Sequence, residues 1–313
     1  MYVLRRLLVA VPTLFAVSIL AFWFVDMIPG DPAAQLAGNM ASNEEIAAIR
    51  SHLGLDRSPI ARYGLFLKGI VDPEIAVSYR TSRPVVQEIG ERLPKTLIVA
   101  VGGLVLGIVF GVVTGVICAL RQGGWFDAIV TIFTLAGISM PIYWLGLLCI
   151  WLFAVELRWL PAAGATTPWH FVLPVVVVAT RPAALFSRLV TANLLEVMGK
   201  DYLDTARSKG LSETRVIVCH ALRNSLVAAV SVAGVQFGGM LGGSVVTETV
   251  FGIPGLGRLL VEAVGSSDYP VIQYCVLMFA AVFIVINLAV DLIGQWLDPR
   301  TQENSSATGY GRP

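Results

Sequence analysis

The sequence predicts an all-α membrane protein with six transmembrane helices, cytoplasmic N and C termini, and a helical cap outside the membrane between spans 1 and 2. The first observation is compositional, because 56% of the 313 residues are hydrophobic, only 14% are charged, and the mean hydropathy is +0.76. Soluble domains carry about 25% charged residues, so an ordinary soluble globule is excluded. The second is that long stretches carry no charge at all, and about 20 apolar residues cross a bilayer as a helix. The third is an unequal division of Lys and Arg between alternate loops.

Five charge-free runs are long enough to span a bilayer, and a sixth apolar run contains charges. The first run follows Arg5-Arg6 and has no small-residue cleavage site, so we expect it to remain as a signal anchor. The run Phe171–Val190 contains Arg181 and Arg188, and we expect bends at its two prolines. The five clear runs are Leu7–Val25, Leu97–Leu120, Ala128–Val155, Ser225–Thr247 and Tyr269–Val290.

The positive-inside rule favours six spans over five. With the N terminus inside, the cytoplasmic segments hold Arg5, Arg6, Arg121, Arg188, Lys200, Arg207, Lys209, Arg215, Arg223, Arg300 and Arg312. The two short outer loops hold only Arg158 and Arg258. Eight more basic residues lie in 29–96, but loops longer than about 60 residues translocate regardless of charge. Six spans with both termini inside fit this distribution.

The segment 29–96 is predicted to be a small helical cap. Asp31-Pro32 is typical of an N-cap followed by a proline at the first helical position. Ser42 and Glu45 have the spacing of a capping box, and the helix that they open is expected to end at Gly54. Ser58-Pro59 and Arg83-Pro84 predict two further helix starts. The chain thus divides into an anchor (1–28), the cap (29–96), a five-helix core (97–298) and a polar, disordered tail (299–313).

Two spans carry glycine at every fourth position. Residues four apart lie on nearly the same helix face, so such a ridge lets another helix approach closely in the membrane. We predict that these glycines pack helices within the bundle or against a second membrane subunit; sliding of helices along the same ridge is compatible with this. They are Gly103, Gly107, Gly111 and Gly115 in the second span and Gly234, Gly238 and Gly242 in the fifth.

Arg181 lies near the middle of the fourth span. An arginine at that depth costs about 2.5–3.5 kcal/mol on insertion scales, so it should face a partner or a wet cavity. The residues leave open a structural ion pair or snorkelling position and a place along a translocation path.

The loop 196–224 is the longest predicted cytoplasmic loop and carries alternating charge. Asp201–Ser208 is predicted to be a short helix that Gly210 ends in a left-handed conformation. Ser212 is predicted to cap the next helix, with Glu213 in its first turn. A solvated loop is the simplest interpretation, but the sequence of the first helix indicates a functional role.

Asp204-Thr205-Ala206-Arg207-Ser208-Lys209-Gly210 resembles the EAA loop of ABC importer permeases, with Ala206 and Gly210 at the Ala-x3-Gly spacing. Further matches extend over nearly the whole chain: Pro29-Gly30-Asp31-Pro32, Leu53-Gly54-Leu55-Asp56, Arg92-Leu93-Pro94-x-Thr96-Leu97, Ser139-Met140-Pro141, Leu160-Pro161, Glu248-x2-Phe251-x2-Pro254-Gly255-Leu256-Gly257-Arg258, Asp268-Tyr269-Pro270-Val271-x-Gln273 and Leu297-Asp298-Pro299-Arg300. The chain is identified as resembling the first membrane subunit of the dipeptide/oligopeptide/nickel/glutathione importer family. Pro73–Ala76 departs from the Gly-Asp-Leu-Gly that is usual there.

The resemblance implies a type I ABC importer permease fold in a bacterial or archaeal cytoplasmic membrane. It implies three kinds of partner besides lipid: a second homologous permease, two cytoplasmic ATPases that bind ATP and Mg²⁺, and an extracytosolic binding protein. This chain is expected to bind no cofactor or metal and to be no enzyme itself. Coupling to the ATPase is assigned to Asp201, Tyr202, Asp204, Thr205, Ala206, Lys209 and Gly210. The translocation path is assigned to Arg181, Ser139, Met140 and Gln236.

The residues themselves agree on the absence of an energy-supplying site. No G-x4-G-K-[ST] phosphate loop occurs, since the only Gly-Lys pair, Gly199-Lys200, is followed by Asp201. Four scattered cysteines and three histidines predict no metal site, and the net charge of +1 predicts no nucleic-acid partner. A secondary transporter or channel is the alternative class, but it leaves the charged loop unexplained. The resemblance implies a di- or oligopeptide as the cargo, with glutathione or a nickel chelate as alternatives.

Overall fold

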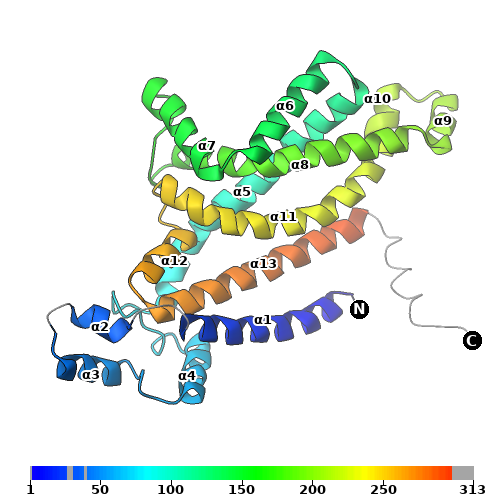
Figure 1. Ribbon diagram of the computed structural model, residues 1–313. Helices are drawn as coiled ribbons and strands as arrows, with labels where there is room; N and C mark the ends of the chain where they lie inside the picture. Colours follow the sequence, from blue (N-terminus) through cyan, green and yellow to red (C-terminus); the bar gives the residue numbers. More distant parts are fainter. Residues whose placement is uncertain (1, 27–30, 39–40, 298–313) are drawn as a thin grey trace, which may run out of the picture. The chain divides into compact units, whose positions relative to one another are not determined.

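The computed structural model describes residues 2–26, 31–38 and 41–297, and most of them lie in helices (Figure 1). They form two compact units. Unit 1 consists of the described parts of Met1–Leu97, Ala163–Thr166 and Ser244–Ile284. Unit 2 consists of those of Ile98–Ala162, Thr167–Gly243 and Val285–Pro313. The predicted tail 299–313 and Pro29-Gly30 lie outside the described residues.

Unit 1 begins with α1 and the three short helices of the predicted cap. The N-cap signals of the cap are confirmed: Asp31 accepts a hydrogen bond from the N–H of Ala33, and Ser42 and Glu45 form the capping box. Ser58 accepts one from the N–H of Ala61. The helix opened by Ser42 ends just before Gly54, which has a φ of +67°. The four helices are α1 (Tyr2–Asp26), α2 (Pro32–Ala37), α3 (Asn43–His52) and α4 (Pro59–Val71).

Two buried carboxylates organise the rest of unit 1. Asp268 accepts hydrogen bonds from the Ser78 hydroxyl at 2.5 Å and from the N–H groups of Tyr79 and Arg80, just before α13 (Tyr269–Leu297). Glu248 accepts the Thr96 hydroxyl at 2.6 Å and the N–H of Arg258 at 2.9 Å, which lies in the first turn of α12 (Leu256–Gly265). Buried carboxyl groups require hydrogen-bonding partners, so these contacts fix the ends of both helices.

Glycine is required where Glu248 meets the start of α12. A Cβ on Gly255 would lie 2.3 Å from the Glu248 carboxyl carbon, and one on Gly257 would lie 2.6 Å from the Val245 Cα. The Pro-Gly-Leu-Gly-Arg segment thus supplies the close approach that lets one carboxylate bond helix-terminal N–H groups.

Unit 2 contains most of α5 and the helix that packs on it, α8. The helix α5 (Val85–Leu120) starts directly after Pro84, as predicted, and continues through Pro94 and across the expected boundary at residues 96 and 97. The helix α8 (Val172–Met198) follows the 3₁₀ turn η2 (Pro168–Phe171) and continues through Pro182. The bends expected at the two prolines of this run stay predictions.

The α5 glycines lie directly against α8. A Cβ on Gly103 would meet Val178 at 2.9 Å, and one on Gly107 would meet Pro182 at 2.8 Å. A Cβ on Gly111 would lie 2.5 Å from the Phe186 Cβ, and one on Gly115 would lie 2.6 Å from the Ser187 carbonyl oxygen. Glycine at all four positions therefore sets the distance between the two helices.

The charge-free run Ala128–Val155 does not form one straight helix. It contains α6 (Trp125–Ser139), then α7 (Ile142–Cys149) continuing into the π-helix η1 (Ile150–Glu156), with a bend of 113° between them. The cause is Pro141, which donates no backbone hydrogen bond and forces Met140 into an extended conformation, with ψ of 133°. The helix α6 packs against α8 (Figure 1).

The remaining elements follow α8 in chain order: α9 (Asp201–Ser208), α10 (Glu213–Arg215), the π-helix η3 (Val216–Ala221) and α11 (Leu222–Val250). Within the described residues, three helices meet the length and hydropathy expected of a span: Val85–Leu120, Pro168–Met198 and Tyr269–Gln295. The bent pair counts as a fourth if it is one span, and α1 has a shorter apolar stretch, Leu8–Phe24. The count of six and the sidedness stay predictions.

The α5–α8 contact gives a stability prediction. Gly111→Ala should lower the thermal unfolding midpoint in detergent, because overpacking a tight contact typically costs about 1–3 kcal/mol. Gly90→Ala is the matched control in the same helix, since nothing lies within 4 Å of the added Cβ. That change should be neutral or slightly stabilising. Equal midpoints for both variants, measured by size-exclusion fluorescence after heating, would contradict the close contact.

Candidate functional site

The short helix α9 has one buried and one exposed face. Leu203 is fully buried and Ala206 is 6% exposed, and both belong to an apolar cluster with Leu194 of α8 and Val216 of η3. Ala119 and Ala221 complete the cluster, which thus contains the ends of α5 and α8 and the segment leading into α11. Small and apolar residues at positions 203 and 206 therefore anchor α9 to three longer helices.

The turn after α9 is a Schellman motif. The N–H of Gly210 donates to the Arg207 carbonyl oxygen at 2.9 Å, and the N–H of Leu211 donates to that of Ala206 at 3.5 Å. Gly210 has a φ of +77°, as predicted, a conformation that residues with a Cβ adopt at a cost. Nothing lies within 4 Å of a Cβ built on Gly210, so its requirement is conformational.

Arg207 joins α9 to α10 across this turn. Its guanidinium donates two hydrogen bonds to the Glu213 carboxylate, at 2.9 and 3.2 Å, and one to Asp204 at 2.9 Å. This hydrogen bonding lowers the pKa of Glu213 below its ordinary 4.5 and raises the pKa of Arg207. Because the folded pKa of Glu213 is lowered, the contribution of the pair is present above pH 4.5 and is lost as the pH falls through the lowered value.

The opposite face of α9 is exposed and carries mixed polar groups. Tyr202 is 41% exposed, and Asp201, Thr205 and Lys209 are exposed with it. Positions 202, 205 and 209 share one side of a helix. The structure thus brings most of the predicted coupling residues onto one surface, with Asp204 engaged by Arg207 and Ala206 on the buried side. This surface can dock a protein partner, and it holds no group of three His, Cys, Asp or Glu within the described residues that could bind a metal.

The predicted path residues lie in α6, the α6–α7 bend, α8 and α11. Arg181 and Ser139 are exposed, and Met140 and Gln236 are half-buried. Within the described part of the chain, no hydrogen bond or ion pair joins any two of the four. The α6 end does reach α8, because a Cβ on Gly137 would lie 3.7 Å from Thr180.

The α11 glycines differ among themselves. A Cβ on Gly234 would lie 2.3 Å from the Asn287 side-chain oxygen, so this glycine faces α13. Gly242 is exposed, with nothing within 4 Å of a Cβ, and Gly238 is half-buried. Unlike the α5 ridge, the α11 series thus packs within this chain at one end and is open at the other.

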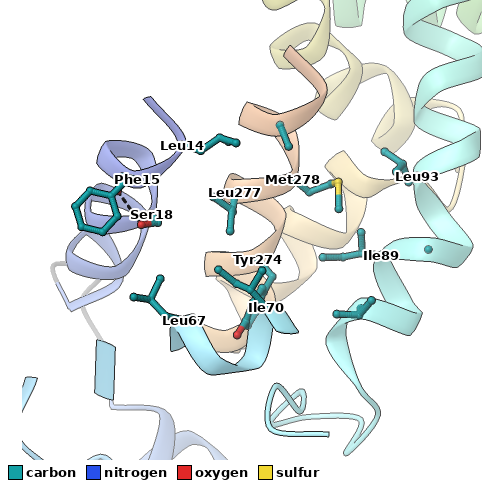
Figure 2. A pocket seen from close by; sticks show the side chains of 13 residues that line it. Leu14, Phe15, Ser18, Leu67, Ile70, Ile89, Leu93, Tyr274, Leu277 and Met278 are labelled. Atoms are coloured by element: carbon teal, nitrogen blue, oxygen red, sulfur yellow. Dashed lines mark hydrogen bonds between the residues drawn. The ribbon is translucent and has the colours of Figure 1, made fainter. Parts of the chain in front are cut away.

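A cavity of about 570 Å³ in unit 1 is almost wholly apolar (Figure 2). Figure 2 shows that its lining comes from α1, α4, α5 and α13, with side chains such as Leu67, Ile89 and Leu277. Its hydroxyls already have partners, because Tyr274 donates to the Phe66 carbonyl oxygen at 2.6 Å and Ser18 lies 2.9 Å from the Tyr63 hydroxyl. The cavity therefore offers no recognition of a charged or peptide-like ligand.

Arg207 and Glu213 are site residues that the sequence-based coupling set did not include. The Asp204–Arg207 pair could have been inferred, because opposite charges three residues apart meet on a helix. The Arg207–Glu213 pair depends on the reversal of the chain at Gly210, which brings two helices together.

Comparison with known proteins places these features in context. Residues 1–100 match the family model described as the N-terminal part of binding-protein-dependent transport system membrane components, and residues 111–303 match the one for binding-protein-dependent transport system inner membrane components. The chain is 42% identical to the glutathione transport system permease protein GsiC of Escherichia coli K12 over 298 residues, covering 95% of this chain and 97% of that one.

A second relative is also a permease subunit, and a solved structure has a similar fold. The dipeptide transport system permease protein DppB of Alkalihalophilus pseudofirmus is 37% identical over 327 residues, covering 96% of this chain and 98% of that protein. A chain of the inward-facing MetNI methionine ABC transporter superposes with a TM-score of 0.55 at 20% identity, covering 69% of this chain and 99% of that one. This likeness shows the fold.

The Arg207 contacts give a test of the turn. Arg207→Ala should speed amide hydrogen exchange over residues 201–213, because the α9–α10 connection loses its bidentate ion pair. Arg215→Ala, a change of an exposed arginine in the same loop, is the control and should leave exchange unchanged. The exchanged pair Arg207→Glu with Glu213→Arg should restore protection. Identical exchange in Arg207→Ala and the unaltered chain would refute the bracing role.

Proposed function

The chain belongs to the binding-protein-dependent transport system inner membrane components and is an ABC importer permease subunit of the glutathione/dipeptide type; from this we propose that it moves peptides across the membrane by alternating access. We infer that it pairs with a second permease, two ATPases and an extracytosolic binding protein. ATP and Mg²⁺ are bound by the ATPases. The proposal includes six spans and cytoplasmic termini.

The anchoring of α9 supports a role in coupling. Only Gly199 and Lys200 separate α8 from α9, and the N–H of Lys200 donates to the Val197 carbonyl oxygen at 3.0 Å. The helix η3, which packs on α9, leads without a break into α11. A displacement of α9 by an ATPase would therefore move the ends of both long helices together, which is how a rigid-body change of state can be driven from the cytoplasmic side.

The exposed face of α9 is the proposed contact with the ATPase. Tyr202 supplies an aromatic ring, and Asp201, Thr205 and Lys209 surround it with groups that hydrogen-bond. Exposed aromatic residues with a polar rim are typical of protein interfaces. ATP binding then shifts the permease between two states. The size of the shift is set by the difference between the free energies with which the ATPase docks on each state.

The cargo is proposed to be a di- or oligopeptide, and glutathione is the second candidate. The similarity to a glutathione permease over nearly the whole chain supports the second candidate. Both are peptides with free carboxylates, so one transport assay with labelled dipeptide and labelled glutathione can rank them. Uptake should require the binding protein and ATP.

Gly210 gives the test of coupling. Gly210→Val should leave the permease assembled but lower uptake per ATP hydrolysed, because a β-branched residue at a φ of +77° distorts the turn. Gly210→Asn should retain more uptake, since asparagine tolerates this conformation. Uptake and ATP hydrolysis are measured together in proteoliposomes that contain the whole importer.

Gly123→Val is the matched control. Gly123 has a φ of +75° with nothing within 4 Å of a Cβ, so the local strain is equal, but it lies in the α5–α6 turn. It should preserve the ratio of uptake to hydrolysis. An unchanged ratio in Gly210→Val, or an equal loss in Gly123→Val, would rule out a specific coupling role for the α9 turn.

A further inference from the structure

One face of α8 becomes exposed from Arg181 onward. Arg181, Arg188 and Ala192 are exposed along it, with Leu185 half-buried between the two arginines. These positions lie within about 60° of one another around a helix. The other faces are covered, since Pro182 and Phe186 meet the α5 glycines and Thr180 lies beside the end of α6. We call Arg181, Leu185, Arg188 and Ala192 the α8 strip.

The α8 strip begins at membrane depth and runs toward the end of the helix where the positive-inside count places Arg188. Arg181 is close to the middle of Pro168–Met198, one of the described helices with the length and hydropathy of a span. Arg188 follows two turns later, about 10 Å along the axis. Two guanidinium groups in contact with lipid would be unfavourable, so this face requires water or an anionic partner.

No anion within the described residues serves these arginines. Neither Arg181 nor Arg188 has a hydrogen bond or ion pair in the described part of the chain. The nearest acidic residue further along α8, Glu196, pairs with Lys200 at 3.2 Å. The charges of the strip are thus available to a group that the described residues do not supply.

We propose that the α8 strip is a cationic selectivity element of the translocation path, which favours peptides of net negative charge over neutral ones. The proposal rests on the permease function proposed above. A guanidinium fork binds carboxylates with paired hydrogen bonds, and two forks in series can pass a carboxylate from one to the next. Ala192, one turn after Arg188, is small and leaves room for a ligand beside that arginine.

The alternative occupant of the strip is a pair of carboxylates from the second permease. In that arrangement the arginines would stay paired and shielded from water in every state of the importer. The path is favoured because the strip mixes two arginines with Leu185 and Ala192, whereas a buried ion-pair interface requires further hydrogen-bonding groups to satisfy the charges.

The first experiment measures charge selectivity of uptake. The complete importer in proteoliposomes is given glutathione, which is anionic, or its glycine monoethyl ester, which is neutral, after the affinity of the binding protein for each has been measured. The double variant Arg181→Gln with Arg188→Gln should reduce glutathione uptake roughly tenfold, the effect of losing a charged hydrogen bond. Uptake of the ester should stay unchanged, and the double lysine variant should retain much of the preference.

Ala192→Gln is the control within the same strip, since it adds a polar side chain and leaves both charges in place. It should alter both probes equally. Equal loss of both probes in the double glutamine variant would overturn the proposal, as would loss of the second permease on copurification, which would assign the arginines to an ion-pair interface.

The second experiment does not depend on which cargo is carried. Leu185→Cys, in a chain whose four cysteines are replaced, is treated with an anionic and a cationic methanethiosulfonate of similar size. The anionic reagent should react faster, and the preference should disappear when both arginines are glutamine. A cysteine that reacts with neither reagent in any nucleotide state would overturn the proposal. If the unaltered importer carries neither peptide, the proposed cargo is wrong, and the thiol ratio still decides the charge of the path.

Discussion

The contact between α5 and α8 is the constraint on which unit 2 depends. Four glycines one turn apart remove every side chain from one face of α5, so the α8 residues Val178, Pro182 and Phe186 lie against its backbone. Lipid supplies no hydrophobic force between helices, so close packing and interhelical hydrogen bonds hold them. Thr114 contributes one of these bonds, at 3.0 Å to the Ser187 hydroxyl.

This close packing makes α8 suitable for transmitting movement. Packed interfaces shift between discrete arrangements rather than deforming continuously. A helix with one face set by glycines and another covered by α6 moves as a unit, and α9 is attached to its end by two residues. In the proposed path, the same helix presents its exposed face, with two arginines, to the transported peptide. Coupling and selectivity would thus reside on one element.

Local signals in the sequence predicted local structure well. The caps at Asp31, Ser42 and Ser58, the α9 helix and the left-handed Gly210 each depend on a few neighbouring residues, and all are present. The bend at Pro141 was not predicted, although the sequence contains this proline. The apolar run was identified from its hydropathy, which carries no information about the direction of the helix axis. The Arg207–Glu213 and Asp268–Ser78 contacts could not be predicted, since they require the chain to return from a distance set by tertiary structure. The depth of Arg181 in the membrane could be inferred from the sequence, but its position on the exposed face of α8 could not.

We propose that the exposed face of α9 docks on the ATPase and moves with it. Replacing Tyr202 by a photoreactive phenylalanine analogue in the assembled importer tests this directly, with the exposed Trp159 as a second position. Irradiation should attach Tyr202 to the ATPase, with a yield that changes when ATP is added, and should attach Trp159 to no ATPase. A Tyr202 adduct only with lipid or with the binding protein, or a yield indifferent to ATP, would contradict the account.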